Sequence, residues 1–394
     1  MITAISIDLL QHYWWFLISL LGGILVFLLF VQGGQTLIYS LGKTENERTM
    51  LVNSLGRKWE FTFTTLVTFG GAVFASFPLF YSTSFGGAYW VWIAILLCFV
   101  IQAVAYEFRS KPNNLLGAGT YETFLFINGT LGTFLLGVAV ATLFTGANFT
   151  VNLDQLISNN VLSITRRVPN DYAITRWNSS AHGLEALLDI RNIILGLAVL
   201  FLARVQGILY FMNTIDHPAI YSKAKKQLLY NAIPFVLFFV VFLLILVLKS
   251  GYTFIPDTHQ VTIEPYKYLH NLIQMPVTLV LLLVGVILVL YGIFISLMKE
   301  TSSGIWFSGT GTILTVTMLF LITAYNNTAY YFSYSDIQST LTLQNSSSSY
   351  YTLKVMSYVS LFIPVVLAYI IYSWRSINNK KIDENELKED THLY

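Results

Sequence analysis

Two long apolar stretches, residues 59–81 and 88–106, lie close together in the chain and constrain its fold more than any other feature. Each is about as long as the roughly 20 residues that an α-helix needs to cross the hydrocarbon core of a bilayer. A small uncharged turn joins them, and a carboxylate flanks each outer end, Glu60 near the start of the first and Glu107 after the second. Because backbone polar groups in lipid must be bonded within their own segment, this pattern predicts a hairpin of two transmembrane helices.

Similar apolar stretches recur along the whole chain. Hydrophobic residues make up 55% of the 394 residues and charged residues only 11%, whereas a soluble domain has about 25% charged residues. We therefore expect an all-α integral membrane protein, with a single polytopic membrane domain over residues 1–375 and a solvated cytoplasmic tail over residues 376–394. Nine transmembrane helices are predicted, at residues 14–38, 59–81, 88–106, 122–145, 190–213, 227–248, 274–298, 305–325 and 354–374.

The distribution of lysine and arginine predicts the orientation in the membrane. The first cationic residue is Lys43, so the first span lacks the cationic start of a cleavable signal, and we expect it to be retained with the N-terminus outside. With that start, most of the cationic residues fall on the inner loops and the tail, as the positive-inside rule requires. Nine spans then place the C-terminus in the cytoplasm.

The residues that the sequence lacks argue against several kinds of chemistry. Cys98 is the only cysteine and lies in an apolar span, so the chain can form neither an internal disulfide nor a thiolate metal cluster. None of the six histidines falls inside a predicted span, where an inward-facing haem ligand would lie. The net charge of +2 is too small to indicate nucleic acid as a partner. We therefore expect no metal, redox centre or catalytic residue in this chain.

The first hairpin also carries an extended motif. Its core is GGAVFASFPLFYSTSFGGAY at residues 70–89, preceded by Asn53, Ser54 and Trp59 and followed by YEFRSK at residues 106–111. Further matching positions are Gln206 with Gly207, residues 352–356 and residues 391–394. In these positions the chain resembles subunit II of cytochrome bd-type quinol oxidases.

This resemblance implies a multi-pass protein of the bacterial cytoplasmic (inner) membrane, built from two four-helix bundles plus one extra helix. In the family, subunit I carries two b-type haems, one d-type haem and the site for membrane quinol, and subunit II completes the complex without ligating haem. The implied reaction is oxidation of quinol coupled to reduction of oxygen to water. The resemblance leaves open whether small accessory subunits join and whether a quinone or lipid is bound within this chain.

Three residues are candidates for a proton path along the cytoplasmic half. The family pattern usually has two acidic residues in the first span; we place these positions at Gln32 and Gln35, whose amides cannot take up or release a proton near neutral pH. The alternative is that the Gly-Gly pair between them serves close helix packing and both glutamines face a neighbouring helix. Glu60 follows Trp59 where the family has Trp-Asp. It is either a proton-uptake group or an ordinary acid stabilised in the first turn of a helix.

Four residues are expected to make contacts between helices or with another subunit: Arg204, Glu107, Arg109 and Trp59. Arg204 lies near the centre of a span, where a charge costs about 2.5–3.5 kcal/mol, so it needs a carboxylate, backbone carbonyls or an anionic cofactor group, from this chain or from another subunit. Glu107 and Arg109, two residues apart, do not face each other on a helix and are expected to pair elsewhere. The alternative function is a secondary transporter with a mid-membrane polar site at Arg204, although no clear repeat supports it.

Overall fold

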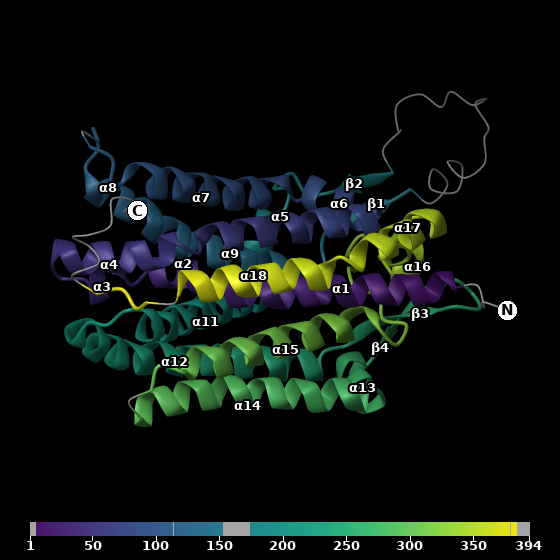
Figure 1. Ribbon diagram of the computed structural model, residues 1–394. Coiled ribbons are helices and arrows are strands. Elements are labelled where there is room, and N and C mark those ends of the chain that lie inside the picture. Colours follow the sequence, from purple (N-terminus) through teal and green to yellow (C-terminus); the bar gives the residue numbers. More distant parts are fainter. Residues whose placement is uncertain (1–4, 113, 153–173, 300, 379, 384–394) are drawn as a thin grey trace.

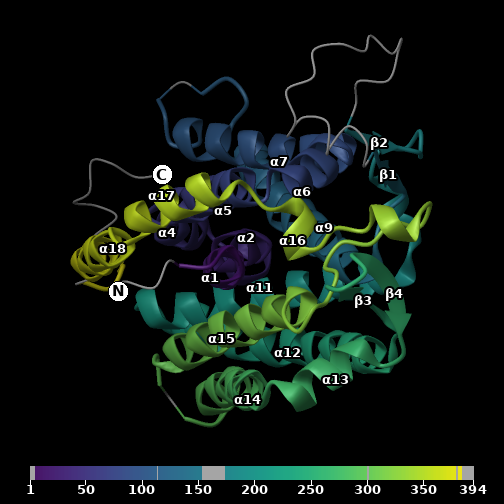
Figure 2. The same cartoon turned by 90° about the vertical axis from the view of Figure 1, so that its right-hand side faces the viewer.

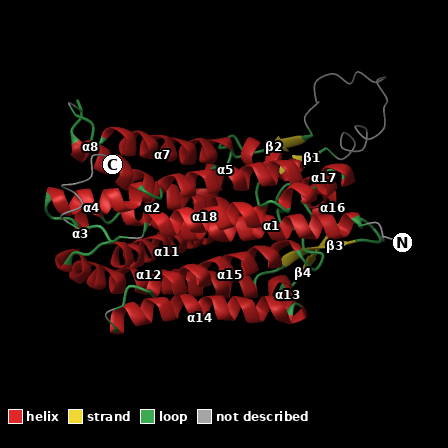
Figure 3. Ribbon diagram, in the orientation of Figure 1, coloured by secondary structure: helices red, strands yellow, loops and turns green. Residues whose placement is uncertain are grey.

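The computed structural model describes residues 5–112, 114–152, 174–299, 301–378 and 380–383. The molecule is an elongated bundle whose long helices lie nearly parallel to one axis (Figure 1). Short strands gather at one end, near the start of the first helix, and we call this the strand end (Figure 3). Helix α4 (Glu45–Gly56) lies at the opposite end, which we call the α4 end.

Eight helical segments of the described chain are long and apolar enough to cross a membrane. Each overlaps one of the predicted spans, so the all-α membrane fold is confirmed. They are Ile7–Gln35 (α1, Ile7–Leu28, with α2, Phe30–Gln35), Tyr89–Phe108 (α7), Ala118–Thr145 (α8, Ala118–Ile127, π-helix η2, Asn128–Gly132, and α9, Thr133–Thr145), Ile190–Thr214 (α11), Pro218–Leu248 (α12), Pro276–Met298 (α14), Gly304–Ala324 (α15) and Tyr350–Ile377 (α17, Tyr350–Ser360, with α18, Ile363–Ile377).

The predicted span at residues 59–81 differs from the other eight. It forms α5 (Trp59–Ser76) and α6 (Pro78–Tyr81), and the chain continues as the π-helix η1 (Ser82–Gly86). Proline lacks the backbone N–H that a continuous helix needs, which accounts for the break at Phe77. Glu60 and four threonines make α5 less apolar than the eight segments above. Nine crossings, and their grouping into two four-helix bundles, therefore stay predictions.

The first helix begins earlier than predicted, at Ile7 instead of residue 14. The Ser6 hydroxyl accepts a hydrogen bond from the Leu9 backbone N–H at 3.1 Å and caps the helix. His12 therefore lies inside the first helical segment that is long and apolar enough to cross a membrane, whereas the predicted span began after it. Its ring is near the helix start, where Nδ1 is 2.8 Å from the Asp8 carbonyl oxygen.

Helices α2 and α11 are in close backbone contact near the centre of the bundle. Figure 2, a view along the bundle, shows α1 in the middle, with α5 and α7 on one side, α11 and α15 on the other, and α18 at the edge. A Cβ atom on Gly33 of α2 would lie only 1.9 Å from the carbonyl oxygen of Ala203 on α11. Only glycine allows α2 and α11 to approach this closely, as small residues do at helix contacts in lipid.

Two small antiparallel sheets cap the strand end (Figure 3). Strand β1 (Phe149–Val151) pairs with β2 (Thr175–Trp177), and β3 (Gly251–Ile255) pairs with β4 (Gln260–Glu264). The first pairing sets Phe149 opposite Trp177, and the second sets Gly251 opposite Glu264. Four short helices complete this end: η3 (Leu184–Leu188), α13 (Lys267–Gln274), η4 (Ile337–Ser339) and α16 (Leu343–Ser346).

The last helix and the residues after it form a peripheral arm. None of the α18 side chains is buried, and the helix continues to Ile377, past the predicted end of the membrane domain. The chain then returns to the bundle, where Ile382 forms a parallel bridge with Ile215 at the end of α11. Ile382 is buried, so this part of the predicted solvated tail is packed. The rest of the tail, residues 384–394, lies outside the described residues.

Candidate functional site

Four polar side chains form a buried cluster between α2 and α7, in the half of the bundle toward the α4 end. Gln32 Nε2 donates a hydrogen bond to Gln102 Oε1 at 3.1 Å, and Gln35 Nε2 donates to the Tyr106 hydroxyl at 3.0 Å. Their spacing of three residues on α2 and four on α7 places each pair on one helix face. All four side chains are buried. We call these residues, together with Asn128, the amide cluster.

Asn128 begins the π-helix η2, which packs against both α2 and α7. Its side chain is fully buried, and neither Oδ1 nor Nδ2 has a hydrogen-bond partner within the described residues. The same holds for Gln32 Oε1, Gln35 Oε1 and Gln102 Nε2. Buried polar atoms are nearly always hydrogen-bonded, to protein or to ordered water. The amide cluster therefore has hydrogen-bonding capacity suited to buried water molecules.

Trp59 and Glu60 are adjacent in sequence but lie in different surroundings. The Trp59 ring stacks on Tyr106, with centroids 5.7 Å apart, so Trp59 packs against the edge of the amide cluster. Glu60 is exposed on the surface of the bundle. The structure thus brings Gln32 and Gln35 together with Trp59, and leaves the Glu60 carboxylate outside the buried cluster.

Arg204 binds two neutral side chains of this chain. Its Nε donates to Asn231 Oδ1 on α12 at 2.5 Å, and its Nη1 donates to the Thr36 hydroxyl, just after α2, at 3.0 Å. The guanidinium is half-buried, whereas both acceptors are buried. The expected partner was a carboxylate, a carbonyl or a cofactor anion, whereas the observed partners are an amide and a hydroxyl of this chain.

Replacing Arg204 by leucine is expected to destabilise the chain by about 1–3 kcal/mol, because Asn231 Oδ1 would be left buried without its donor. If the chain assembles with a larger subunit, as the resemblance implies, the same change should lower the yield of the assembled complex. Thermal unfolding of the purified complex and the recovered amount of its partner measure both effects. Arg176→Leu, at an exposed position of β2, is the control. A stable, fully assembled R204L complex would contradict the prediction.

Glu107 and Arg109 do not pair with each other. Arg109 is buried and its Nη2 lies 2.8 Å from Glu122 Oε1 on α8, while Arg48 Nε lies 3.1 Å from Glu122 Oε2. Glu107 is exposed and pairs with Lys111, four residues along the chain, at 3.2 Å. Glu122 was not predicted as a site residue, because it was taken only as the first residue of the span at 122–145.

Lys58 is a second buried cation at the α4 end. It precedes α5, its side chain is fully buried, and its Nζ lies 4.6 Å from the ring centroid of Trp374 on α18. Burial, with a smaller contribution from the neighbouring Arg57 charge, lowers the pKa of Lys58 to about 8. An ammonium over an indole face is an attractive cation–π pair, so Lys58 helps to attach α18 to the bundle.

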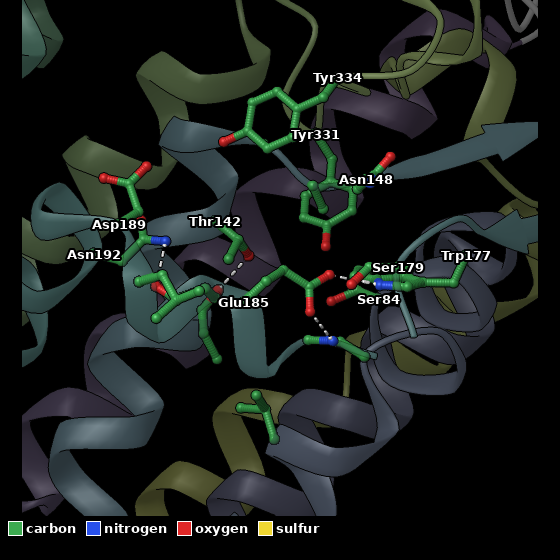
Figure 4. A pocket seen from close by; sticks show the side chains of 18 of the residues that line it. Ser84, Thr142, Asn148, Trp177, Ser179, Glu185, Asp189, Asn192, Tyr331 and Tyr334 are labelled. Carbon is green, nitrogen blue, oxygen red and sulfur yellow. Dashed lines mark hydrogen bonds between the residues drawn. The ribbon is translucent and has the colours of Figure 1, made fainter. Parts of the chain in front are cut away.

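A cavity of about 580 Å³ lies at the strand end, between the start of α7, the end of α9, the start of α11, η3 and the segment around Tyr331. Figure 4 shows the Glu185 carboxylate near its centre, with Trp177 and Tyr331 around it. Glu185 Oε1 accepts from Trp177 Nε1 at 2.8 Å, and Oε2 accepts from the Gly183 backbone N–H at 2.8 Å. The carboxylate is thus held in a fixed orientation.

The remaining polar groups of this cavity are also held by the fold. Asp189 accepts hydrogen bonds from Arg191; burial alone would raise the pKa of Asp189, but these hydrogen bonds outweigh it and hold the pKa below its usual value. Burial raises the pKa of the Tyr331 hydroxyl. Trp92 lines this cavity and also a smaller, wholly apolar cavity of about 90 Å³ deeper in the bundle.

The described residues contain no group of three or more histidine, cysteine, aspartate or glutamate side chains arranged to hold a metal ion. The structure is thus that of a polytopic α-helical membrane protein with a buried amide cluster toward one end and a polar cavity at the other.

Comparison with known proteins identifies the family. The profile described as "Cytochrome bd terminal oxidase subunit II" matches residues 10–377, and the chain belongs to this family. It is 24% identical to cytochrome bd-I ubiquinol oxidase subunit 2 of Escherichia coli (strain K12), over 98% of this chain and 99% of that protein. It is 26% identical to cytochrome bd ubiquinol oxidase subunit 2 of Bacillus subtilis (strain 168), over 88% of each.

The fold also matches a solved structure. A chain of the bd oxidase from Geobacillus thermodenitrificans superposes with a TM-score of 0.54 at 10% sequence identity, covering 94% of this chain and 96% of that one. At this identity the likeness concerns the fold alone. The family match over residues 10–377 confirms the resemblance to cytochrome bd subunit II that the 70–89 motif and its flanks indicated.

Proposed function

We propose that the chain is the non-haem-ligating subunit II of a quinol oxidase that reduces oxygen to water. Support comes from the family match over residues 10–377 and from relatives whose names describe subunit 2 of a ubiquinol oxidase. The two b-type haems, the d-type haem and the quinol site would belong to a larger partner, subunit I, with or without small accessory subunits. Family membership does not favour the transporter alternative at Arg204.

We infer that α5 with α6 makes a ninth crossing. Eight crossings would place the start of the first helix and the end of the last helix on the same side of the membrane. Instead, α1 begins at the strand end, whereas α18 ends near α11 and the α4 end, where Ile382 pairs with Ile215 (Figure 1). An odd number of crossings fits this arrangement. The α4 end would then face the cytoplasm, with the N-terminus outside and the C-terminus inside.

The proposed docking face for subunit I is formed by α5 and α18. Exposed apolar side chains of α5 include Phe63, Val67 and Phe74, and α18 has no buried side chain at all. The exposed Glu60 lies on α5 and would face the partner or the cytoplasmic surface. In a protein of this class, a helix with so little internal packing needs either lipid or another subunit around it.

The amide cluster supports a role in holding water on the cytoplasmic side. The observation that carries this proposal is the set of buried amide atoms in Gln32, Gln35, Gln102 and Asn128 without partners in the described chain. Amides do not titrate near neutral pH, so such waters would relay protons without a protein carboxylate. The close packing at Gly33 accompanies this role and does not compete with it.

The two cavities that share Trp92 suit a bound quinone or lipid. The 580 Å³ cavity offers polar and aromatic groups for a head group, and the 90 Å³ cavity offers an apolar wall for a chain. The water-holding role of the amide cluster and the quinone or lipid site both require that the chain functions within the oxidase complex.

Purification of the chain from its native membrane tests the proposed function. A larger haem-bearing chain should copurify, and the preparation should consume oxygen when supplied with quinol. Haem bound to this chain when it is isolated, or solute transport by the chain without any haem protein, would contradict the proposal.

Replacing Glu60 by glutamine tests the proton-uptake role. If its carboxylate delivers protons at the cytoplasmic surface, quinol-driven oxygen consumption should fall about tenfold or more, and its pH dependence should change. Glu45→Gln, at an exposed acid in the first turn of α4 at the same end, is the matched control. An E60Q complex with unchanged turnover and pH profile would leave Glu60 as a helix-capping charge.

A further inference from the structure

A negative charge near the centre of the cavity at the strand end has no cationic partner within the described residues (Figure 4). The Glu185 carboxylate accepts hydrogen bonds from two neutral donors, the Trp177 indole and the Gly183 backbone N–H. The ion pairs of the described chain do not include Glu185. A carboxylate can accept about four hydrogen bonds. Glu185 therefore keeps both its charge and part of its accepting capacity for a ligand.

The rest of the lining favours a cationic ligand. The second carboxylate of the cavity, Asp189, is already neutralised by Arg191 at 2.6 Å. Among the described lining residues there is no lysine, arginine or histidine. Four aromatic side chains line the same space: Trp92, Trp177, Tyr331 and Tyr334. An ammonium group is attracted both by aromatic rings and by a carboxylate, so this cavity is suited to a ligand that carries one.

The edge of the cavity indicates that the ligand comes from the membrane. Leu188 and Ile190 line the cavity and are also exposed on the outside of the bundle, at the start of the membrane-spanning α11. Trp92 is shared with the wholly apolar cavity deeper in the bundle. A small soluble amine would leave these apolar surfaces uncovered, whereas the acyl chains of a lipid would cover them. The volume of about 580 Å³ lies in the usual range of ligand sites, so a whole head group can enter.

The chemistry of the cavity also separates a lipid from a quinone. An oxidised quinone presents carbonyl oxygens, which accept hydrogen bonds but cannot donate them. The Glu185 carboxylate also only accepts when it is ionised. A primary ammonium group supplies the donors that this carboxylate needs, and it supplies the opposite charge.

The cavity is separate from the proposed docking face for subunit I. That face consists of α5 and α18, and none of the described lining residues lies on either helix. The lining comes from η1, α7, α9, β2, η3 and α11 and from the segments around Asn148 and Tyr331. A ligand in the cavity and subunit I on the docking face can therefore be bound at the same time.

We propose that this cavity binds the head group of phosphatidylethanolamine from the outer leaflet, with the Glu185 carboxylate as counter-ion to the ammonium group. The ammonium N–H groups would donate to Glu185, and the acyl chains would leave past Leu188 and Ile190. The Ser179 hydroxyl and the Asn148 side-chain amide line the same cavity and would donate to the phosphate. The inference deepens the proposed quinone or lipid site, and it rests on the proposed function for placing the strand end at the outer surface.

Native mass spectrometry of the intact, detergent-purified complex tests the proposal, with phosphatidylethanolamine or phosphatidylglycerol of the same acyl chains added as probes. The wild type should retain phosphatidylethanolamine at least tenfold more strongly than phosphatidylglycerol. Because a hydrogen bond to a charged group contributes about tenfold or more, Glu185→Gln should bind phosphatidylethanolamine about tenfold more weakly. The matched control, Asp257→Asn, removes an exposed acid between β3 and β4, at the same end but outside the cavity, and should bind as the wild type does.

Four results would overturn the proposal. Equal retention of the two lipids by the wild type would show that the ammonium group does not select the ligand. Displacement of phosphatidylethanolamine by millimolar free ethanolamine would identify a site for soluble amines, and displacement by a short-chain quinone would identify a quinone site. Equal losses in E185Q and D257N would identify a general effect of surface charge. The first three comparisons use only the wild-type complex, so they decide the matter even if E185Q assembles poorly.

The oxidase function is tested separately in the same preparation, by its haem content and its quinol-driven oxygen consumption. An active, haem-containing complex that binds both lipids equally would contradict only the lipid site. A preparation without haem or oxidase activity would contradict the proposed function, whichever lipid it retains.

Discussion

Replacing Glu122 by glutamine is expected to destabilise the protein by about 3–5 kcal/mol, the range measured when one partner of a buried ion pair is removed. Glu122 is 2% exposed and binds Arg109, which is 4% exposed, at 2.8 Å. It also binds Arg48 at 3.1 Å. The neutral amide would remove the carboxylate charge that pairs with the buried Arg109 guanidinium. Because these residues join α4, the end of α7 and α8, the α4 end of the bundle should lose its fixed arrangement.

Thermal unfolding of the purified complex, followed by circular dichroism or by protease sensitivity, measures this effect. The control is Glu107→Gln, which removes a carboxylate only two residues from Arg109 but from a pair that is 63% and 55% exposed. Exposed pairs contribute about 0–1 kcal/mol, so E107Q should unfold almost as the wild type does. If E122Q and E107Q unfolded at the same temperature, the buried pair would have no special role in stability.

Replacing Gly33 by alanine is expected to have the second largest effect, a loss of about 1–3 kcal/mol or more. The added Cβ would lie 1.9 Å from the Ala203 carbonyl oxygen and 2.5 Å from the Arg204 backbone nitrogen. These are backbone atoms, which cannot rotate away as a side chain can. Helices α2 and α11 would have to separate, and the hydrogen bond from Arg204 to Thr36 would be strained with them.

Gly71→Ala provides the matched control for this substitution. Gly71 also lies within a helix, α5, but a Cβ there would meet no atom within 4 Å. Alanine is favoured over glycine in a helix by about 1 kcal/mol, so G71A should be neutral or slightly stabilising. The midpoint of thermal unfolding compares the two variants; the yield of assembled complex does not, because Gly71 is exposed on α5, which belongs to the proposed docking face. A G33A protein as stable as G71A would show that the α2–α11 contact can relax at no cost.

The amide cluster shows which parts of a site can be predicted from the sequence. The glutamines at 32 and 35 could be placed on one helix face, because a spacing of three residues fixes that face. Their partners Gln102 and Tyr106 could not be identified, since these lie about 70 residues away in the chain. A polar residue deep in the apolar stretch at 88–106 was the available signal for Gln102. Asn128 gave a similar signal, but its π-helical setting depends on packing.

The partners of Arg204 also could not be identified from the sequence. Its sequence position predicted that the charge needs partners, because a charge deep in a span is unfavourable. The acceptors are Asn231 on α12 and Thr36 just after α2, which lie far apart in sequence. Neutral polar residues are common, so composition could not single them out. Glu60 shows a different limit, since it is adjacent to Trp59 in sequence but is exposed and lies outside the amide cluster.

The amino-acid sequence by itself determined the class of protein, the approximate membrane segments and the family, because length, hydropathy and local motifs are properties of single segments. The tertiary structure alone decided which charges are paired, which amides meet, and where the chain after α18 attaches. Those contacts depend on the rotation and close approach of helices distant in sequence, and small residues such as Gly33 set that approach. The helix break at Phe77 depends on both: Pro78 predicts it from the local sequence, and the packing of the surrounding helices determines how it affects the fold.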